Sequence, residues 1–208
     1  MYLPPQFNIR ENQVAADLMR GYPFASLISN DEDGMPFVSH VPLHLEERDV
    51  GLFLLGHCAK PNPHWRYLRE RPKAAVTFLG PQAYMSPRVY PDLARVPTWN
   101  YLAVHCSVVA TLVEEPLAKD QLLKKLIGDH DPDYIAQWIA LGADYQHRML
   151  AGIVGFELQV ASLQCKVKIN QHRTEAHGKM RAQYGVGNEN ERALAVWMDR
   201  LGIGVAPG

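Results

Sequence analysis

The segment from Gly56 to Trp65 combines small residues, a cation and several hydrogen-bond donors, and it directly follows an apolar run. The Lys60 ammonium, the His57 imidazole and the Asn62 side-chain amide can each donate to a phosphate oxygen. A helix is expected to begin just behind them, and the N–H groups at a helix start also attract anions. The spacing fits equally an ordinary capped loop stiffened by prolines. Both interpretations, a phosphate site and a structural loop, remain open on these residues.

A second set of residues gathers aromatic rings, prolines and amides between Gly80 and His105. Trp99 and Tyr101 are suited to wall a planar ligand, with polar neighbours bonding its edge, as in most small-molecule pockets. The same rings more often act as core residues or as anchors of a dimer interface, so spacing alone favours the structural interpretation. The polar neighbours are Ser86, Thr98 and Asn100.

The sequence contains few of the motifs that are typical of metal sites or of catalytic nucleophiles. The nine histidines form no HExxH or HxH motif and no Cys/His pair at zinc-finger spacing, so we predict no structural zinc site. His40 and His44 would share one side of a strand only in an unbroken register, which leaves a metal or heme role as a minor alternative. No cysteine has a flanking catalytic pattern and GxSxG is absent, so no catalytic residue is assigned.

Basic side chains outnumber acidic ones between Gln164 and Arg181, where Glu175 is the single acid. This segment is the best candidate for contact with nucleic acid, although a solvated basic surface is the more common reason for such a run. Its basic side chains are Lys166, Lys168, Arg173, Lys179 and Arg181.

Composition sets the broad class of the protein. The chain has 208 residues, 47% of them hydrophobic, with a formal net charge of −1, which allows a packed core and excludes disorder as the main state. Three separated cysteines form no disulfide framework, as is typical of a reducing compartment. No stretch approaches the roughly 20 apolar residues of a membrane span, and the N-terminus lacks a signal-peptide pattern. We expect a cytoplasmic protein that does not enter the membrane.

The spacing of apolar residues and the positions of turn-forming residues predict the secondary-structure elements that position these residues. Six apolar runs are expected to be strands, and the turn cluster Asp31–Gly34 joins two of them as a hairpin. Hairpin-length connections favour an antiparallel sheet or a small β-barrel over a parallel sheet. The runs are Phe24–Asn30, Met35–Leu45, Gly51–His57, Ala74–Leu79, Thr98–Leu112 and Ile153–Val167.

Apolar residues at helical spacing predict several helices around this sheet, so the expected fold class is mainly β with peripheral helices (α+β). A helix is expected between Glu11 and Arg20 with Gly21 as its C-cap, and a short one after Pro61. The other expected helices are Leu117–Ile127, Tyr134–Leu141 and Glu189–Leu201, the last packing on the body or on a partner.

Taken in order, several segments resemble the PaiB-type family of FMN-binding split-barrel proteins, which are known as negative transcriptional regulators. The most specific are GHxAxxNPxW at Gly56–Trp65 and VPTWNY at Val96–Tyr101. Further matching segments are Met1–Phe7, Pro23–Leu27, Ser39–Leu43, Gly80–Pro87 and Ile153–Glu157, followed by Lys166 and Lys168.

The resemblance implies a six-stranded antiparallel split β-barrel that forms a homodimer with FMN at the subunit interface. We expect residues 1–170 to form this barrel with inserted helices, and residues 171–208 to pack on it or on the partner. Tyr84, Trp99 and Tyr101 are the expected dimer anchors, and part of the flavin wall comes from the partner subunit. The implied flavin contacts are His40, Val41, Pro42, His57, Ala59, Lys60, Asn62, Trp65, Tyr84, Ser86, Thr98, Trp99 and Asn100.

Two classes of function remain open at this point. One is an FMN-binding regulator that represses transcription with the flavin or its redox state as the signal; the other is a flavin-dependent oxidoreductase or heme-handling enzyme. The chain shows no clear helix-turn-helix unit, so we expect DNA binding by this chain alone to be weak or indirect. The absence of GxGxxG, together with one cation-bearing loop, favours FMN over FAD or a nicotinamide.

Overall fold

The computed structural model describes residues 1–92 and 94–204. The chain divides into two compact units. Unit 1 comprises Met1–Leu18, Leu79–Val104 and the chain from Gln164 onward, and unit 2 comprises Met19–Phe78 and His105–Leu163. In the described residues, no helix is both long enough and apolar enough to cross a membrane.

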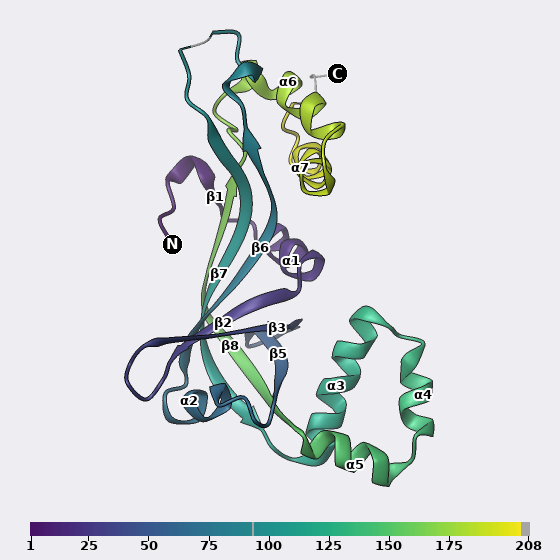
Figure 1. Cartoon of the computed structure of the whole chain (residues 1–208). Helices are drawn as coiled ribbons and strands as arrows, with labels where there is room; N and C mark the ends of the chain where they lie inside the picture. The colour runs from purple at the N-terminus through teal and green to yellow at the C-terminus, as the bar shows by residue number, and fades with distance from the viewer. Residues whose placement is uncertain (93, 205–208) are drawn as a thin grey trace. The chain divides into compact units, whose positions relative to one another are not determined.

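The strands pair in the order β3-β2-β6-β7-β8-β5-β4, with β1 beside β8 (Figure 1). The registered pairs are antiparallel, as predicted, and β3 and β4 end the order without pairing to each other, so the sheet is not closed. The strand bounds are β1 Asn8–Ile9, β2 Phe24–Asn30, β3 Pro36–Pro42, β4 His44–Arg48, β5 Gly51–Ala59, β6 Lys73–Met85, β7 Thr98–Val113 and β8 Ile153–Lys168.

The predicted strand count of six becomes eight in the described chain. The expected run Met35–Leu45 is broken at Leu43, whose N–H donates to the carbonyl of Pro23 at 3.0 Å instead of continuing the strand. β1 has only two residues, too few for any periodic signal.

The β2–β3 hairpin of unit 2 forms as predicted, with Ser26 opposite His40. The Asp31 carboxylate accepts hydrogen bonds from the N–H groups of Asp33 at 3.0 Å and Met35 at 2.8 Å. Gly34 adopts a φ of 80°, a left-handed conformation that glycine tolerates without strain. The turn therefore follows from its own residues.

Both faces of β5 are covered within unit 2. A Cβ on Gly56 would lie 2.5 Å from a methyl carbon of Leu43 and 2.8 Å from the Phe156 ring, so only glycine allows this close approach. On the opposite face, Leu55 packs against Leu122 and Leu126. This double burial fixes the direction in which β5 delivers the loop that follows it.

The helices of unit 2 are α2 His64–Glu70, α3 Pro116–His130, α4 Tyr134–Ala140 and α5 Ala143–Ala151. The predicted short helix and the two amphipathic helices are confirmed. Helix α5 was missed because Leu150 is its single buried residue, which leaves almost no periodic apolar signal. Helices α3 to α5 together connect β7 to β8 (Figure 1).

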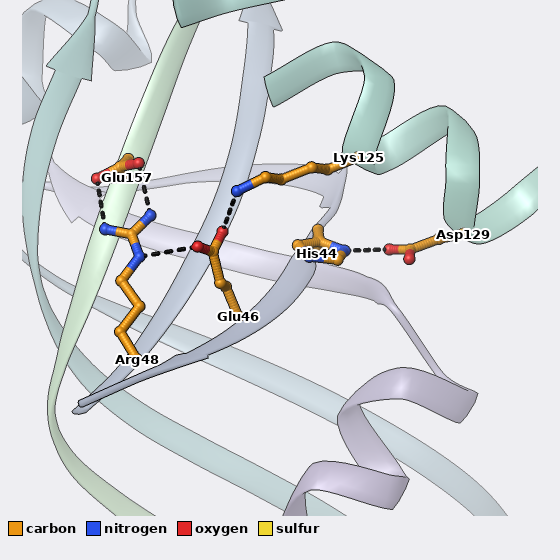
Figure 2. Close-up of polar contacts among 6 residues, drawn as sticks. All are labelled: His44, Glu46, Arg48, Lys125, Asp129 and Glu157. Carbon is orange, nitrogen blue, oxygen red and sulfur yellow. Dashed lines mark hydrogen bonds and ion pairs between the residues drawn. The ribbon is translucent and has the colours of Figure 1, made fainter. Parts of the chain in front are cut away.

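Ion pairs attach α3 to the edge strand β4 (Figure 2). His44 Nδ1 lies 2.7 Å from an Asp129 carboxylate oxygen, and Lys125 Nζ lies 2.5 Å from the Glu46 carboxylate. His44 and Glu46 share one face of β4, while Lys125 and Asp129 stand one turn apart on α3. The two contacts therefore act in parallel along the helix.

Arg48 extends this network from β4 to β8 (Figure 2). Its guanidinium donates to Glu46 at 3.0 Å and to both Glu157 oxygens at 2.8 and 3.1 Å, and it lies 4.1 Å from the centre of the Phe53 ring. Hydrogen bonding to Arg48, opposed in part by burial, lowers the pKa of Glu46 to about 2. Partly buried, bidentate pairs of this kind contribute more than isolated surface pairs.

Unit 1 holds η1 Pro5–Phe7, β1, most of α1 Asn12–Gly21, η2 Pro87–Val89, α6 Thr174–Gly185 and α7 Glu189–Arg200, together with the unit 1 portions of β6, β7 and β8. The predicted helix after Glu11 and the C-terminal helix are confirmed. Helix α7 begins with a capping box between Asn188 and Glu191 and buries Leu194, Trp197 and Met198. Helix α6 was missed because its buried face carries few strongly apolar residues: Ala176, Met180 and Tyr184, with His177 beside them.

Candidate functional site

The loop between β5 and α2 has a backbone held on both sides. The Lys60 N–H donates to the Gly152 carbonyl at 2.8 Å, and the Lys60 carbonyl accepts from the Trp65 indole at 3.0 Å. The Asn62 N–H closes a turn onto the Ala59 carbonyl at 2.9 Å. The Lys60 side chain stays exposed, with no ion pair among the described residues. The loop therefore presents one cation from a fixed backbone.

A buried hydroxyl on β3 fastens this loop to the sheet. Ser39 Oγ accepts from the Asn62 side-chain amide at 3.0 Å and contacts His64 Nδ1 at 2.8 Å. The side-chain oxygen of Asn62, Oδ1, in turn accepts a hydrogen bond from the backbone N–H of His64 at 3.0 Å. These three side chains form a closed network between β3 and the start of α2. The asparagine and histidine of the NPHW segment therefore serve first to position the loop.

His64 is a neutral, buried member of that network. Its ring is 1% exposed and meets the edge of Phe37 with ring centres 5.1 Å apart. Burial lowers the pKa of His64 to about 4, so the imidazole is uncharged at neutral pH. The ring bonds Ser39 Oγ through Nδ1, and its other nitrogen is Nε2. That Nε2 has no partner among the described residues.

His57 precedes the loop on β5, opposite Gly155 of β8. Burial also lowers the pKa of His57. Its Nδ1 is buried and has no hydrogen-bond partner within the described chain. An unsatisfied ring nitrogen of this kind leaves a hydrogen bond available to a bound group.

The β3 residues expected to touch the flavin lie on different faces of the strand. His40 is exposed and bonds Ser26 Oγ at 3.1 Å, on the face opposite Ser39 and the buried Val41. Pro42 ends the strand. His40 therefore points away from the Ser39 network.

A cavity of about 290 Å³ in unit 2 brings two predicted residues, Lys60 and Trp65, together with three that sequence reasoning missed. The three are Glu114 after β7, Lys119 on α3 and His147 on α5. No local signal marks them, because they come from a helical segment far from the loop in sequence.

The remaining predicted flavin contacts belong to unit 1. Tyr84 and Trp99 are each about half exposed and meet edge to face with ring centres 6.3 Å apart. Thr98 Oγ1 accepts from Lys168 at 2.6 Å, and Ser86 caps η2 through the Arg88 N–H at 3.2 Å. This surface presents aromatic rings beside a cation.

Asn100 lies in the interior of unit 1, away from that surface. It is fully buried and donates to the Tyr184 hydroxyl at 2.9 Å and towards the sulfur atoms of Met85 and Met180. Burial raises the pKa of Tyr184 to about 12, so its hydroxyl keeps its proton. The Asn100 amide thus ties β7 to α6.

The basic residues between Gln164 and Arg181 are largely engaged within unit 1. Lys166 is 7% exposed and donates to the Tyr2 carbonyl at 3.0 Å. Lys168 donates to Thr98 and to the Trp99 carbonyl, and burial followed by repulsion from Lys166 lowers its pKa.

Arg181 makes a double contact with Asp199 at 2.6 and 2.7 Å. Of the five basic residues, Arg173 and Lys179 form no ion pair with a carboxylate within the described part of the chain.

Comparison with known proteins assigns the family. A family model described as "Putative FMN-binding domain" matches residues 1–162. The chain is 32% identical over 180 residues to "Protease synthase and sporulation protein PAI 2" of Bacillus subtilis (strain 168), covering 84% of each chain. The chain belongs to this FMN-binding family. It is also 31% identical over 102 residues to the uncharacterized protein YKL070W of Saccharomyces cerevisiae, covering 47% of this chain and 59% of that one.

Solved structures resemble this member of the FMN-binding family in fold. The FAD and heme binding protein from Mycobacterium smegmatis matches with a TM-score of 0.63 at 18% identity, covering 78% of this chain and 74% of that chain. The flavocytochrome Anf3 from Azotobacter vinelandii matches with a TM-score of 0.62 at 16% identity, covering 79% and 71%. These likenesses confirm the predicted split-barrel class.

FMN is the cofactor of this family, and the β5–α2 loop fits its phosphate. The loop offers an exposed ammonium without a competing carboxylate, and His57 offers a buried nitrogen without a partner. The ammonium of Lys60 and the ring nitrogen of His57 are both groups that can bind a single anionic group such as a phosphate.

We predict that Ser39→Ala destabilises unit 2 by about 1–3 kcal/mol, because it leaves the partly buried Asn62 amide and the buried His64 ring nitrogen unpaired. Ser26→Ala, on the neighbouring strand of the same hairpin, is the matched control and should change stability by less than about 0.5 kcal/mol. Urea unfolding of both variants checks this. Equal stability of the two variants would show that the network contributes nothing.

We predict that acid destabilises the fold between pH 6.5 and 4. The unfolded chain binds a proton at His64 near pH 6.5, whereas the folded pKa is about 4, so the free energy of unfolding falls as pH drops through this range. His57, with its lowered pKa, acts in the same direction. Urea unfolding at pH 7.5 and 4.5 should show a loss about 1–2 kcal/mol larger for the wild type than for His64→Asn. Identical losses would contradict this assignment.

Proposed function

We propose that the protein is an FMN-binding regulator of gene expression, comparable to its Bacillus relative, and that the flavin phosphate binds at the β5–α2 loop. The observation that carries this proposal is the Ser39 network, which holds the loop while leaving the Lys60 ammonium exposed. The 32% identity to a protein named for protease synthesis and sporulation supports the regulatory part.

Each residue of the loop has a separate task in this proposal. Lys60 contributes the charge opposite the phosphate, and His57 contributes the unpartnered ring nitrogen. Asn62 positions the loop, because its side-chain oxygen and one of its amide hydrogens are already used. Bound FMN supplies one- or two-electron redox chemistry, while the chain binds and orients it.

Unit 1 suits the role of a dimer surface in the same proposal. Tyr84, Trp99 and Tyr101 stand on one side of its strands, and Lys166 lies 5.2 Å from the Tyr101 ring centre. Exposed aromatic rings beside engaged cations are typical of interfaces. We propose a homodimer in which this surface, with Thr98 and Ser86, completes the flavin site of the partner.

A second candidate function is a flavin-dependent oxidoreductase or heme-handling enzyme. The neutral His57 favours it, since an unpartnered imidazole beside a flavin loop is able to exchange a proton with a substrate. Catalytic oxidation of a nicotinamide by the FMN-loaded protein would favour this class over the regulator. The three cysteines are buried and form no disulfide, which supports a reducing, cytoplasmic setting for either function.

We predict that Lys60→Met weakens FMN binding about tenfold or more, because a charge-assisted contact to the phosphate contributes about 1.5–3 kcal/mol. The exposed Lys73 of the same unit offers the control, and Lys73→Met should bind FMN as the wild type does. Visible absorption after gel filtration, with and without added FMN, measures retention. Equal retention by both variants would place the phosphate elsewhere.

We predict that the protein sediments as a dimer at micromolar concentration and that Trp99→Glu shifts it towards the monomer, because a charge on this surface opposes burial. Glutamate at the exposed Val196 of α7 is the matched control, and Val196→Glu should leave the dimer intact. A wild-type protein that sediments as a stable 23.4 kDa species would rule the dimer out.

We predict weak, salt-sensitive DNA binding. With Lys166, Lys168 and Arg181 engaged, a dimer presents Arg173 and Lys179 twice, so the logarithm of affinity should fall against the logarithm of salt with a slope of about −4 or shallower. Labelled duplex DNA titrated at two salt concentrations measures it. Tight, salt-insensitive and sequence-selective binding would instead support direct repression.

A further inference from the structure

Six elements line the 290 Å³ cavity of unit 2: the end of β5, the starts of α2 and α3, the end of α5, the end of β7 and the start of β8. Its size is at the lower limit for small-molecule pockets. Most of its wall is apolar, formed by Trp65, Val113, Pro116, Leu150, Ile153 and Val154. Such a wall suits the hydrocarbon body of a small molecule.

One charged side chain in this wall is nearly buried. Lys119, in the first turns of α3, is 9% exposed, and its Nζ donates to the Leu150 carbonyl at 2.7 Å. An ammonium has three N–H donors, and no carboxylate forms an ion pair with this one among residues 1–92 and 94–204. Because a buried charge without a counterion is costly, this position favours an anion in the cavity.

The other polar groups of the wall leave the cavity positive. The Glu114 carboxylate pairs with Arg69 at 2.5 Å and forms no ion pair with Lys119 among the described residues. Lys60 also borders the cavity but is assigned to the flavin phosphate, so Lys119 is the ammonium left for a second ligand. His147 adds ring nitrogens that can donate. Most polar side chains that line the cavity are therefore hydrogen-bond donors.

We propose that this cavity binds a small organic monocarboxylate with an apolar body, its carboxylate on Lys119 and its hydrocarbon part against Trp65 and Leu150. One buried cation matches one negative charge, and the small volume excludes a nucleotide. The site is different from the flavin phosphate contact, although Lys60 borders both. A regulator that carries this site responds to an aromatic or branched-chain acid as well as to its flavin.

The test uses the full chain loaded with FMN and isothermal titration with sodium phenylacetate as the probe. Wild-type protein should bind the probe with a dissociation constant below about 1 mM, and Lys119→Met should weaken binding at least tenfold while FMN retention stays unchanged. Lys124 lies on the same helix outside the cavity, paired with Asp120 at 2.6 Å, and Lys124→Met should bind the probe normally.

A second variant covers the case in which Lys119→Met does not fold. Ala151 is an exposed residue at the cavity rim, so Ala151→Phe fills the space from the surface and should abolish probe binding. The neutral probe phenylacetamide should bind at least tenfold more weakly than phenylacetate. No binding to wild type, equal affinity for the two probes, unchanged affinity in Lys119→Met or in Ala151→Phe, or loss of FMN from Lys119→Met would each overturn the proposal.

Discussion

The proposed flavin site of unit 2 depends on the hydrogen bonds of the Ser39 hydroxyl. It is buried on β3 and joins the Asn62 amide to the His64 ring, so the loop after β5 cannot move without leaving buried polar groups unpaired. The double burial of β5, made possible by Gly56, fixes where that loop begins. The rigid loop fixes the backbone from which the exposed Lys60 side chain extends, so its ammonium stays within reach of one place where a single phosphate can bind.

A few side-chain contacts also hold the helices α3 to α5, which connect β7 to β8 in unit 2. Ion pairs from His44 and Glu46 of β4 hold the later turns of α3 (Figure 2). Lys119, near the start of that helix, lines the cavity together with Lys60. The cavity thus borders the flavin loop while resting on a separately anchored helix. A ligand in it would touch both, which offers a physical route between a metabolite and the flavin.

The local pattern of the sequence was sufficient to place six strand regions, the β2–β3 hairpin, α3 and α7, because alternation, turn chemistry and capping act over a few residues. Its failures have a common cause in long-range contacts. Nothing near Asn100 in sequence indicates that its amide faces Tyr184, and nothing near Lys166 indicates that it is buried under Tyr2. Helix α5 and the Lys119 cavity were missed for the same reason, since the burial that defines them exists only after folding.

The most direct test of the account compares FMN with riboflavin, which differs by the phosphate alone, in wild type and in Lys60→Met. If Lys60 holds the phosphate, wild-type protein binds FMN at least tenfold more tightly than riboflavin, and most of this preference disappears in Lys60→Met while riboflavin affinity is unchanged. Flavin fluorescence titration gives all four affinities. A preference for FMN that is equally large in both proteins would contradict the account.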